Sequence, residues 1–143
     1  MADSLIIEPA APRMLPRVTD TNRTFWTGGA QGRLMVTRCT SCRRWVLPLS
    51  EICPECDGAT IYEATTGRAT VFTYTLNAHQ FHPDVPPPNL IAIVILDEQE
   101  DLRLATNIVD CEEDEICCGM AVTVLFEKHG EMFYPVFTPD EEK

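Results

Sequence analysis

Four cysteines arranged in two pairs are the residues whose spacing most directly indicates chemistry. Two residues separate the members of each pair and ten residues separate the pairs, which gives Cys39, Cys42, Cys53 and Cys56. Two such turns can bring four thiolates to one point, and tetrahedral Zn²⁺ takes four soft ligands at about 2.3 Å. The spacing therefore predicts a structural zinc site, because four cysteines leave no coordination position for water.

Zinc is the expected metal, with iron in the same site as the alternative for recombinant material. If no metal is bound, the four cysteines would be unligated thiols or would form disulfides. The three other cysteines, Cys111, Cys117 and Cys118, have no comparable spacing. They are expected to act as small apolar residues in or near the wall of a β-barrel, which the second half of the sequence predicts. An odd number of cysteines, two of them adjacent, favours reduced thiols or metal and hence the cytoplasm.

Four arginines form a basic cluster around the first cysteine pair. Arg33, Arg38, Arg43 and Arg44 fall within twelve positions that contain no acidic residue. The guanidinium fork suits phosphate and carboxylate groups equally well. The cluster therefore predicts either a solvated surface on a small exposed lobe or a local site for a phosphate or carboxylate.

The segment from 77 to 88 combines His79, Phe81 and His82 with three consecutive prolines. Two histidines three residues apart could bind a metal or act in acid–base chemistry, but no third ligand is evident nearby. A rigid loop that contacts a partner or ligand, or an inert loop, are the other interpretations.

No recognisable catalytic motif is present. The sequence has no G-x-S-x-G element, no phosphate-cradling glycine motif and no H-E-x-x-H. It also has no convincing pair of nucleophile and base. The chain does not look like a complete enzyme.

Charge divides the 143 residues into two sections that meet near Thr66 and Gly67. The first 66 residues hold seven basic and seven acidic residues, whereas the rest hold four basic and fifteen acidic ones, so the whole net charge of -11 lies there. This acidity disfavours nucleic-acid binding. No apolar stretch approaches the roughly 18 residues of a membrane span, and no secretory signal is expected.

The section before Gly67 is expected to carry an arm and a short helix. Residues 1–19 contain three scattered prolines and predict an extended arm that wraps a partner or is loose. Asp20 and Thr21 are expected to cap a helix over 22–31, weakened by its two adjacent glycines. This helix carries Phe25 and Trp26, which pack on the chain's own core by default and dock onto another subunit in the alternative.

The section after Gly67 predicts β-structure. Alternation and short apolar runs indicate five strands, at 71–77, 90–96, 102–108, 122–126 and 134–137, with a helical turn at 112–116. In the first strand, Phe72, Tyr74 and Leu76 are expected to share one face. Five strands with a turn between the third and fourth is the order of an OB-fold barrel. The predicted fold is mainly β, with a helix and zinc ribbon over 20–66, an OB-fold barrel over 67–138 and an acidic tail over 139–143.

These pieces together resemble a known family. Gly32-Arg33-Leu34 follows the helix, and the stretch from Gly67 resembles the barrel entry G-x-G-x-V-x-[ST]-[FY]-[ST], with Ala69 at the second glycine. The segments 89–96, 104–109 and 119–122 complete the match. Over residues 20–138 the chain resembles acyl-CoA-associated proteins with a rubredoxin-like zinc ribbon and an OB-fold, long known as a domain of unknown function.

The resemblance implies an accessory subunit without catalytic residues of its own. Members of the family typically pair with a thiolase-like subunit of the sterol-carrier-protein type, often as two chains of each. Such pairs make or break carbon–carbon bonds in acyl-CoA substrates, for example in retro-aldol cleavage of steroid side chains, β-ketothiolysis, acyl transfer or hydroxymethylglutaryl-CoA synthesis. The smaller chain would stabilise its partner and shape the acyl-CoA site.

Within such a complex, residues of this chain near coenzyme A would lie on the ribbon side, because the acidic barrel repels a nucleotide. The candidates are Arg38, Arg43, Arg44, Phe81 and His82, and the candidates for the partner interface are Phe25 and Trp26. A stand-alone acyl-CoA-binding protein is one alternative. A zinc-ribbon and OB-fold module for nucleic acids is another, disfavoured by the acidic barrel.

Overall fold

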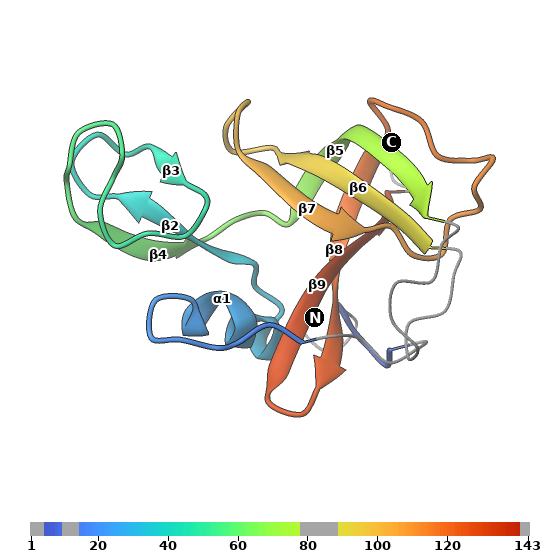
Figure 1. Cartoon of the computed structure of the whole chain (residues 1–143), viewed down its shortest axis with the longest axis horizontal. Coiled ribbons are helices and arrows are strands. Elements are labelled where there is room, and N and C mark those ends of the chain that lie inside the picture. Colours follow the sequence, from blue (N-terminus) through green and yellow to red (C-terminus); the bar gives the residue numbers. More distant parts are fainter. Residues whose placement is uncertain (1–4, 10–14, 78–88, 141–143) are drawn as a thin grey trace.

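The computed structural model describes residues 5–9, 15–77 and 89–140. It places a small three-stranded lobe beside a larger sheet, with a short helix below them (Figure 1). His79, Phe81 and His82 lie outside the described residues. The predicted fold class, mainly β with one short helix, is confirmed.

The small lobe is built on an antiparallel sheet in the order β3-β2-β4. Its central strand β2 (Met35–Cys39) pairs with β3 (Trp45–Val46) on one side and with β4 (Thr60–Ala64) on the other. Of its residues, only Cys39, Val46 and Cys53 form a buried cluster separate from the main core. The lobe therefore has almost no hydrophobic core of its own.

The larger sheet contains the five predicted strands in the predicted order. They are β5 (Arg68–Asn77), β6 (Asn89–Leu96), β7 (Arg103–Asn107), β8 (Ala121–His129) and β9 (Met132–Pro139). Strand β5 pairs with β6 and β8, β6 also pairs with β7, and β8 also pairs with β9. Between β7 and β9 a single parallel bridge joins Ile108 to Phe137, so the sheet curls into an OB-fold without a continuous closing ladder.

One core joins the two lobes. The core enclosed by the larger sheet contains the buried residues Val94, Phe126 and Phe137. Leu34 and Trp45 from the ribbon side belong to the same cluster. Ribbon and barrel therefore pack as one folded body. Residues 65–67 connect the end of β4 to the start of β5.

The N-terminal arm contributes a strand to the larger sheet. Ile6 and Ile7 form β1 (Ile6–Ile7), which pairs in parallel with Phe126 and Glu127 of β8. Two adjacent β-branched residues favour extended backbone and suit an edge position. This part of the arm is therefore fixed to the barrel, whereas the sequence left a choice between wrapping a partner and being loose.

The predicted helix is present but changes type at its glycines. It begins as α1 (Arg23–Thr27) and continues as the 3₁₀ turn η2 (Gly28–Gln31). A Cβ atom on Gly29 would lie 2.5 Å from Cβ of Phe133 and 2.6 Å from Cδ1 of Phe126. The absence of a side chain at Gly29 therefore allows η2 to approach β8 and β9.

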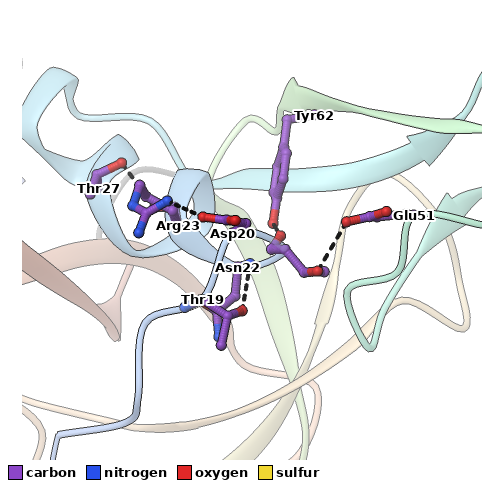
Figure 2. A network of polar contacts seen from close by, with 8 residues as sticks. Thr19, Asp20, Asn22, Arg23, Thr27, Glu51 and Tyr62 are labelled. Atoms are coloured by element: carbon purple, nitrogen blue, oxygen red, sulfur yellow. Dashed lines mark hydrogen bonds and ion pairs between the residues drawn. The ribbon is translucent and has the colours of Figure 1, made fainter.

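The predicted caps were wrong. The helix starts after Asn22, whose side-chain oxygen accepts a hydrogen bond from the Thr19 amide at 2.6 Å, and no side chain caps the helix itself (Figure 2). Asp20 instead forms an ion pair with Arg23 at 2.7 Å. Local pairing with an arginine three residues ahead outcompetes capping by the same carboxylate.

Thr21 ties the start of the helix to the ribbon. Its hydroxyl donates to Glu51 at 3.1 Å, and its carbonyl accepts the Tyr62 hydroxyl (Figure 2). Burial raises the pKa of Tyr62, which keeps the hydroxyl protonated as a donor. These contacts fix the position of Phe25 and Trp26 relative to the ribbon.

Two local features of the barrel concern a turn and a strand. Residues 112–116 contain the single turn that was expected, closed by the Glu115 amide and the Glu112 carbonyl at 2.9 Å. In β5 a register shift between Val71 and Thr73 interrupts the pairing with β6, and Phe72, Tyr74 and Leu76 are all exposed.

We expect Gly29→Ala to destabilise the protein by about 2–3 kcal/mol, because the new methyl overlaps Phe126 and Phe133 in a filled core. Equilibrium unfolding in urea measures this loss. The matched control is Gly130→Ala, whose Cβ would meet no atom within 4 Å and whose φ of 68° costs only about 1 kcal/mol. Equal losses for the two variants would contradict the steric explanation.

Candidate metal centre

The four predicted cysteines converge on one point of the ribbon. Cys39 ends β2, Cys42 follows in the first turn, and Cys53 and Cys56 belong to a second turn closed by a bridge between Ile52 and Ala59. Their four sulfur atoms all lie within 4.8 Å of one another. Among the described residues, this is the one group of potential ligands that is close enough to hold a metal ion.

The sulfur positions fit a tetrahedral Zn²⁺ site. A Zn–S distance of about 2.3 Å implies about 3.8 Å between neighbouring sulfurs of a regular tetrahedron. The Sγ atoms of Cys42 and Cys53 are 3.8 Å apart, and those of Cys39 and Cys56 are 3.4 Å apart. The four thiolates can therefore hold a structural zinc ion, and the predicted ligand set is brought together as expected.

Backbone amides stabilise negative charge on the sulfurs. The amides of Cys42 and Ser41 donate to Sγ of Cys39 at 3.4 and 3.3 Å, and the Glu55 amide donates to Sγ of Cys53 at 3.4 Å. The hydrogen bonds from Cys42 and Ser41 lower the pKa of Cys39 to about 6. The lowered pKa favours the thiolate form of Cys39, which is the form that binds a metal ion.

The neighbouring sulfurs have the opposite effect on Cys56. The Gly58 amide acts to lower its pKa, but hydrogen bonding to the Cys39 and Cys42 sulfurs outweighs that effect and raises the pKa of Cys56 to about 12. Four sulfurs this close cannot all ionise without a compensating cation. Binding of Zn²⁺ supplies that cation and releases the remaining protons.

The turns after each cysteine pair require unusual backbone. Arg43 and Asp57 follow Cys42 and Cys56 with φ of 67° and 63°. A Cβ atom on Gly58 would lie 2.9 Å from both Sγ of Cys39 and Oγ of Ser41. The backbone therefore turns tightly around the sulfurs, and it does so in the same way at both pairs.

Three of the four arginines of the basic cluster, Arg38, Arg43 and Arg44, are paired with carboxylates of this chain. Glu63 on β4 accepts Arg43 at 2.8 Å and Arg38 at 3.3 Å, and Arg44 forms an ion pair with Asp101. Arg38 also lies over the Trp45 ring at 4.7 Å. Hydrogen bonds and charge from Arg43, then from Arg38, hold the pKa of Glu63 below its usual value.

These partners could not be predicted from local sequence, because Glu63 and Asp101 are distant from the arginines along the chain. Gln99 was also missed. Its side-chain oxygen accepts the Trp45 amide at 2.9 Å, and its nitrogen donates to the Trp45 carbonyl at 3.1 Å. The turn between β6 and β7 thus completes the hydrogen bonding of a ribbon strand.

The two aromatic residues of the helix have different environments. Phe25 is 4% exposed and belongs to the core, which was the default expectation for it. Trp26 is partly buried, with its ring centroid 4.7 Å from that of Phe25 and 5.4 Å from that of Tyr134. An interface role therefore stays a prediction that concerns Trp26 more than Phe25.

Two hollows lie where ribbon, helix and barrel meet. The smaller, of about 200 Å³, is walled by Trp26 and Tyr134 together with Leu47, Leu49 and Leu104. The larger, of about 400 Å³, lies between the ribbon and the β6–β7 turn, and its lining includes Ile52, Pro54, Glu55 and the Arg44–Asp101 pair. Both hollows are open to solvent and mainly apolar.

The remaining cysteines divide into two environments. Cys111 is partly buried against the core, and burial followed by the charges of Glu115 and Glu112 raises its pKa. Cys117 and Cys118, which were expected in or near the barrel wall, are exposed. They occupy a turn before β8, closed by the Met120 amide and the Cys117 carbonyl at 3.2 Å.

In the parts of the chain that the structure describes, no helix has the length and apolar character needed to cross a membrane. All seven cysteines are free of disulfides.

Comparison with known proteins agrees with this architecture. The family model for the ChsH2 rubredoxin-like zinc ribbon domain matches residues 26–63, and the model for the ChsH2 C-terminal OB-fold domain matches residues 62–127. A DUF35 domain-containing scaffold protein of Methanocaldococcus jannaschii is 31% identical over 100 residues, covering 68% of this chain and 70% of the relative. The chain belongs to the ChsH2-type DUF35 family. A chain of the solved structure "Ltp2-ChsH2(DUF35) aldolase" matches with a TM-score of 0.78 and 30% identity, covering 87% of this chain and 98% of that one.

Two further proteins are similar to this chain. A probable enoyl-CoA hydratase alpha subunit of Thermomonospora curvata is 34% identical over 136 residues, which cover 92% of this chain but only 41% of the relative. This chain therefore spans about two fifths of that protein. A DUF35-family protein of unknown function from Sulfolobus solfataricus shares the fold, with a TM-score of 0.60 at 18% identity.

We expect purified protein to contain about one zinc ion per chain, because the four sulfurs form one closed tetrahedral set. Elemental analysis by mass spectrometry measures it. Cys39→Ser should lose the metal and most of the thermal stability, since the ribbon has little other core. The matched control, Cys117→Ser, should keep both, because Cys117 is exposed and lies outside the cluster. A stable, metal-free wild-type protein would contradict the site.

Proposed function

We propose that this chain is a non-catalytic accessory subunit of a thiolase-like enzyme that makes or breaks carbon–carbon bonds in acyl-CoA substrates. The catalytic residues belong to the larger partner, and this chain stabilises it and borders its acyl-CoA site. The observation that carries the proposal is the match to the ChsH2 chain of an aldolase, which covers 98% of that chain.

The names of other relatives support a role beside an enzyme. The archaeal relative is described as a scaffold protein, and the Thermomonospora curvata relative as a probable enoyl-CoA hydratase alpha subunit. Steroid side-chain retro-aldol cleavage and β-ketoacyl-CoA thiolysis are examples of the proposed reaction type. A complex of two chains of each kind in the cytoplasm is part of the proposal, and the free cysteines agree with a reducing compartment.

The ribbon supports this role as a rigid element. Its four cysteines would hold zinc, and the ion would supply folding free energy, with no part in the reaction. The fixed ribbon places Leu47 and Leu49 beside Trp26 at the rim of the smaller hollow. An apolar surface of this kind can cover the acyl end of a neighbouring active site and exclude water from it.

Coenzyme A would contact the ribbon through arginines that still have donors available. The side chains of Arg43 and Arg44 are 49% and 37% exposed while paired with Glu63 and Asp101. A guanidinium group has five donors, so each pair leaves some of them for a phosphate. Arg38 is more enclosed, between Glu63 and the Trp45 ring, and would act by holding Glu63 in place.

Reconstitution with a thiolase-like subunit tests the proposed function. We expect co-expression to give a stable complex of two chains of each kind, seen by light scattering, that turns over an acyl-CoA substrate. Each chain alone should be inactive or far less active. Turnover of thioesters by this chain alone, or failure to associate with any such subunit, would overturn the proposal.

The arginine hypothesis has its own test. In the complex, Arg43→Gln together with Arg44→Gln should raise KM for acyl-CoA several-fold with little change in kcat, because phosphate contacts bind substrate and transition state alike. The matched control is Glu63→Gln with Asp101→Asn, which breaks the same ion pairs but keeps the positive charges. This control should leave KM unchanged or lower it. An equal rise in both variants would assign the effect to the ion pairs and not to substrate binding.

A further inference from the structure

Strand β6 is apolar on both faces of the larger sheet. It lies between β5 and β7 (Figure 1), and its even-numbered residues from Leu90 to Leu96 are buried in the core. The alternate residues, Ile91, Ile93 and Ile95, lie on the other side, where Ile91 is 37% exposed and the other two are partly exposed. A strand with one solvated face alternates apolar and polar residues, whereas an unbroken apolar run is typical of a strand covered on both faces. The sequence of β6 therefore suits a sheet that is covered on both sides in its assembled state.

The pairing register shows which residues of β5 and β7 share this side of the sheet. Directly opposed residues of antiparallel strands point to the same side. With the partners of the three isoleucines included, the surface consists of Thr70, Thr73 and Thr75 of β5, the isoleucines of β6, and Arg103, Ala105 and Asn107 of β7. We call this set the outer face. It contains no carboxylate and no lysine, although the section after Gly67 holds fifteen acidic residues.

Arg103 is the one charged side chain of the outer face. It belongs to β7, and its Cζ atom lies 4.3 Å from the centroid of the Phe72 ring on β5, so its side chain extends across β6. Phe72 is the extra residue at the bulge of β5, and it is 45% exposed. Within the described parts of the chain, Arg103 forms no ion pair with a carboxylate. Its guanidinium group is therefore fixed in position while its N–H donors are available.

The outer face has the composition of the centre of a protein–protein interface. Such centres are depleted of lysine and carboxylates and enriched in aromatic residues and arginine. An arginine stacked on an aromatic ring keeps the donors at its edge for a carboxylate. Residues of β6 line neither of the two hollows, and an open sheet face buries too little of a small ligand to hold it. The occupant that this surface suits is another protein.

We propose that the outer face binds the larger, thiolase-like subunit, through a segment that places apolar side chains on the three isoleucines and one carboxylate on Arg103. This inference rests on the proposed function and adds the surface through which the two chains associate. Ala105 belongs both to the outer face and to the lining of the smaller hollow. A partner whose acyl-CoA site borders that hollow therefore reaches the outer face as well.

Charge complementarity selects this occupant over two others. Strands β6 and β7 are the second and third of the barrel, whose outer side binds oligonucleotides in OB-folds, but a phosphate backbone needs several cations and this face has Arg103 alone. A two-fold contact between copies would join the face to itself. Because the face holds no carboxylate, self-pairing would bury both Arg103 groups without an anion, between chains that each carry a charge of -11. A different protein that supplies the carboxylate avoids this cost.

The first test measures the dissociation constant between the full-length, zinc-loaded chain and the thiolase-like subunit with which it is active. Ile93→Lys places a charge at the centre of the outer face and should raise the dissociation constant about 100-fold, because the contact desolvates an unpaired charge. The matched control is Ile61→Lys, which changes an apolar residue of β4 that is 47% exposed and lies outside the face. It should leave the dissociation constant within about threefold of the wild-type value.

The second test concerns the charge of Arg103. Arg103→Glu should weaken the complex about 100-fold or more, because it sets a carboxylate against the carboxylate of the partner, and Arg103→Lys should weaken it about tenfold through loss of the planar fork. The matched control is Arg33→Glu, which changes the net charge equally at an exposed arginine outside the outer face. It should change the dissociation constant far less than Arg103→Glu. Circular dichroism and zinc content check that all variants fold.

A complex that Ile93→Lys and Arg103→Glu leave at wild-type affinity would overturn this docking surface and leave the proposed accessory function standing. Equal weakening by the variants and their matched controls would overturn it as well, because the effect would then not belong to the outer face. Self-association of the chain alone that Ile93→Lys abolishes would assign the face to a second copy and overturn the proposal. Failure of the wild-type chain to bind any thiolase-like subunit would overturn the proposed function itself, and the docking surface with it.

Discussion

The convergence of four cysteine sulfurs is the constraint on which the N-terminal half of this protein depends. Apart from Cys39 and Cys53, the separate buried cluster of the ribbon contains only Val46. Two of its three members are therefore metal ligands, and hydrophobic burial cannot hold the two cysteine turns together. Metal binding supplies that free energy directly, since a zinc site of this kind does not exist in the unfolded chain.

The effects of this constraint extend to the barrel through Trp45, which follows the first cysteine pair. Its side chain is buried in the main core, while its amide and carbonyl both bond to the side chain of Gln99. Next to it, Arg44 pairs with Asp101 from the same β6–β7 turn. A ribbon that loses its metal would release a residue of the shared core as well as these polar contacts. Zinc thus stabilises the junction where the two hollows lie, as well as the ribbon.

Much of this arrangement could be predicted from the sequence, and the reasons differ between its parts. The cysteine spacing and the order of the five strands are properties of short segments, so predicting them does not require knowledge of tertiary contacts. The caps predicted at Asp20 and Thr21 are absent because the two side chains bind Arg23 and Glu51 instead of the helix amides. The bulge at Phe72 is decided by the curvature of the barrel, and the pairing of Arg44 with Asp101 by tertiary contact. Neither leaves a periodic signal in the sequence.

The distribution of charge explains why this fold can present uncharged surfaces without losing solubility. The acidic residues of the second section gather in turns and at the C-terminus, for example at 97–101 and 112–115, and the run from Val71 to Asn77 carries none. Three of the seven arginines of the first section, Arg38, Arg43 and Arg44, are paired with Glu63 or Asp101. A net charge of -11 keeps free chains apart, whereas the apolar junction of ribbon, helix and barrel favours a partner that fits its shape. Because the ribbon and the strands are already fixed, binding at these surfaces orders few additional groups, and that lowers the entropic cost of assembly.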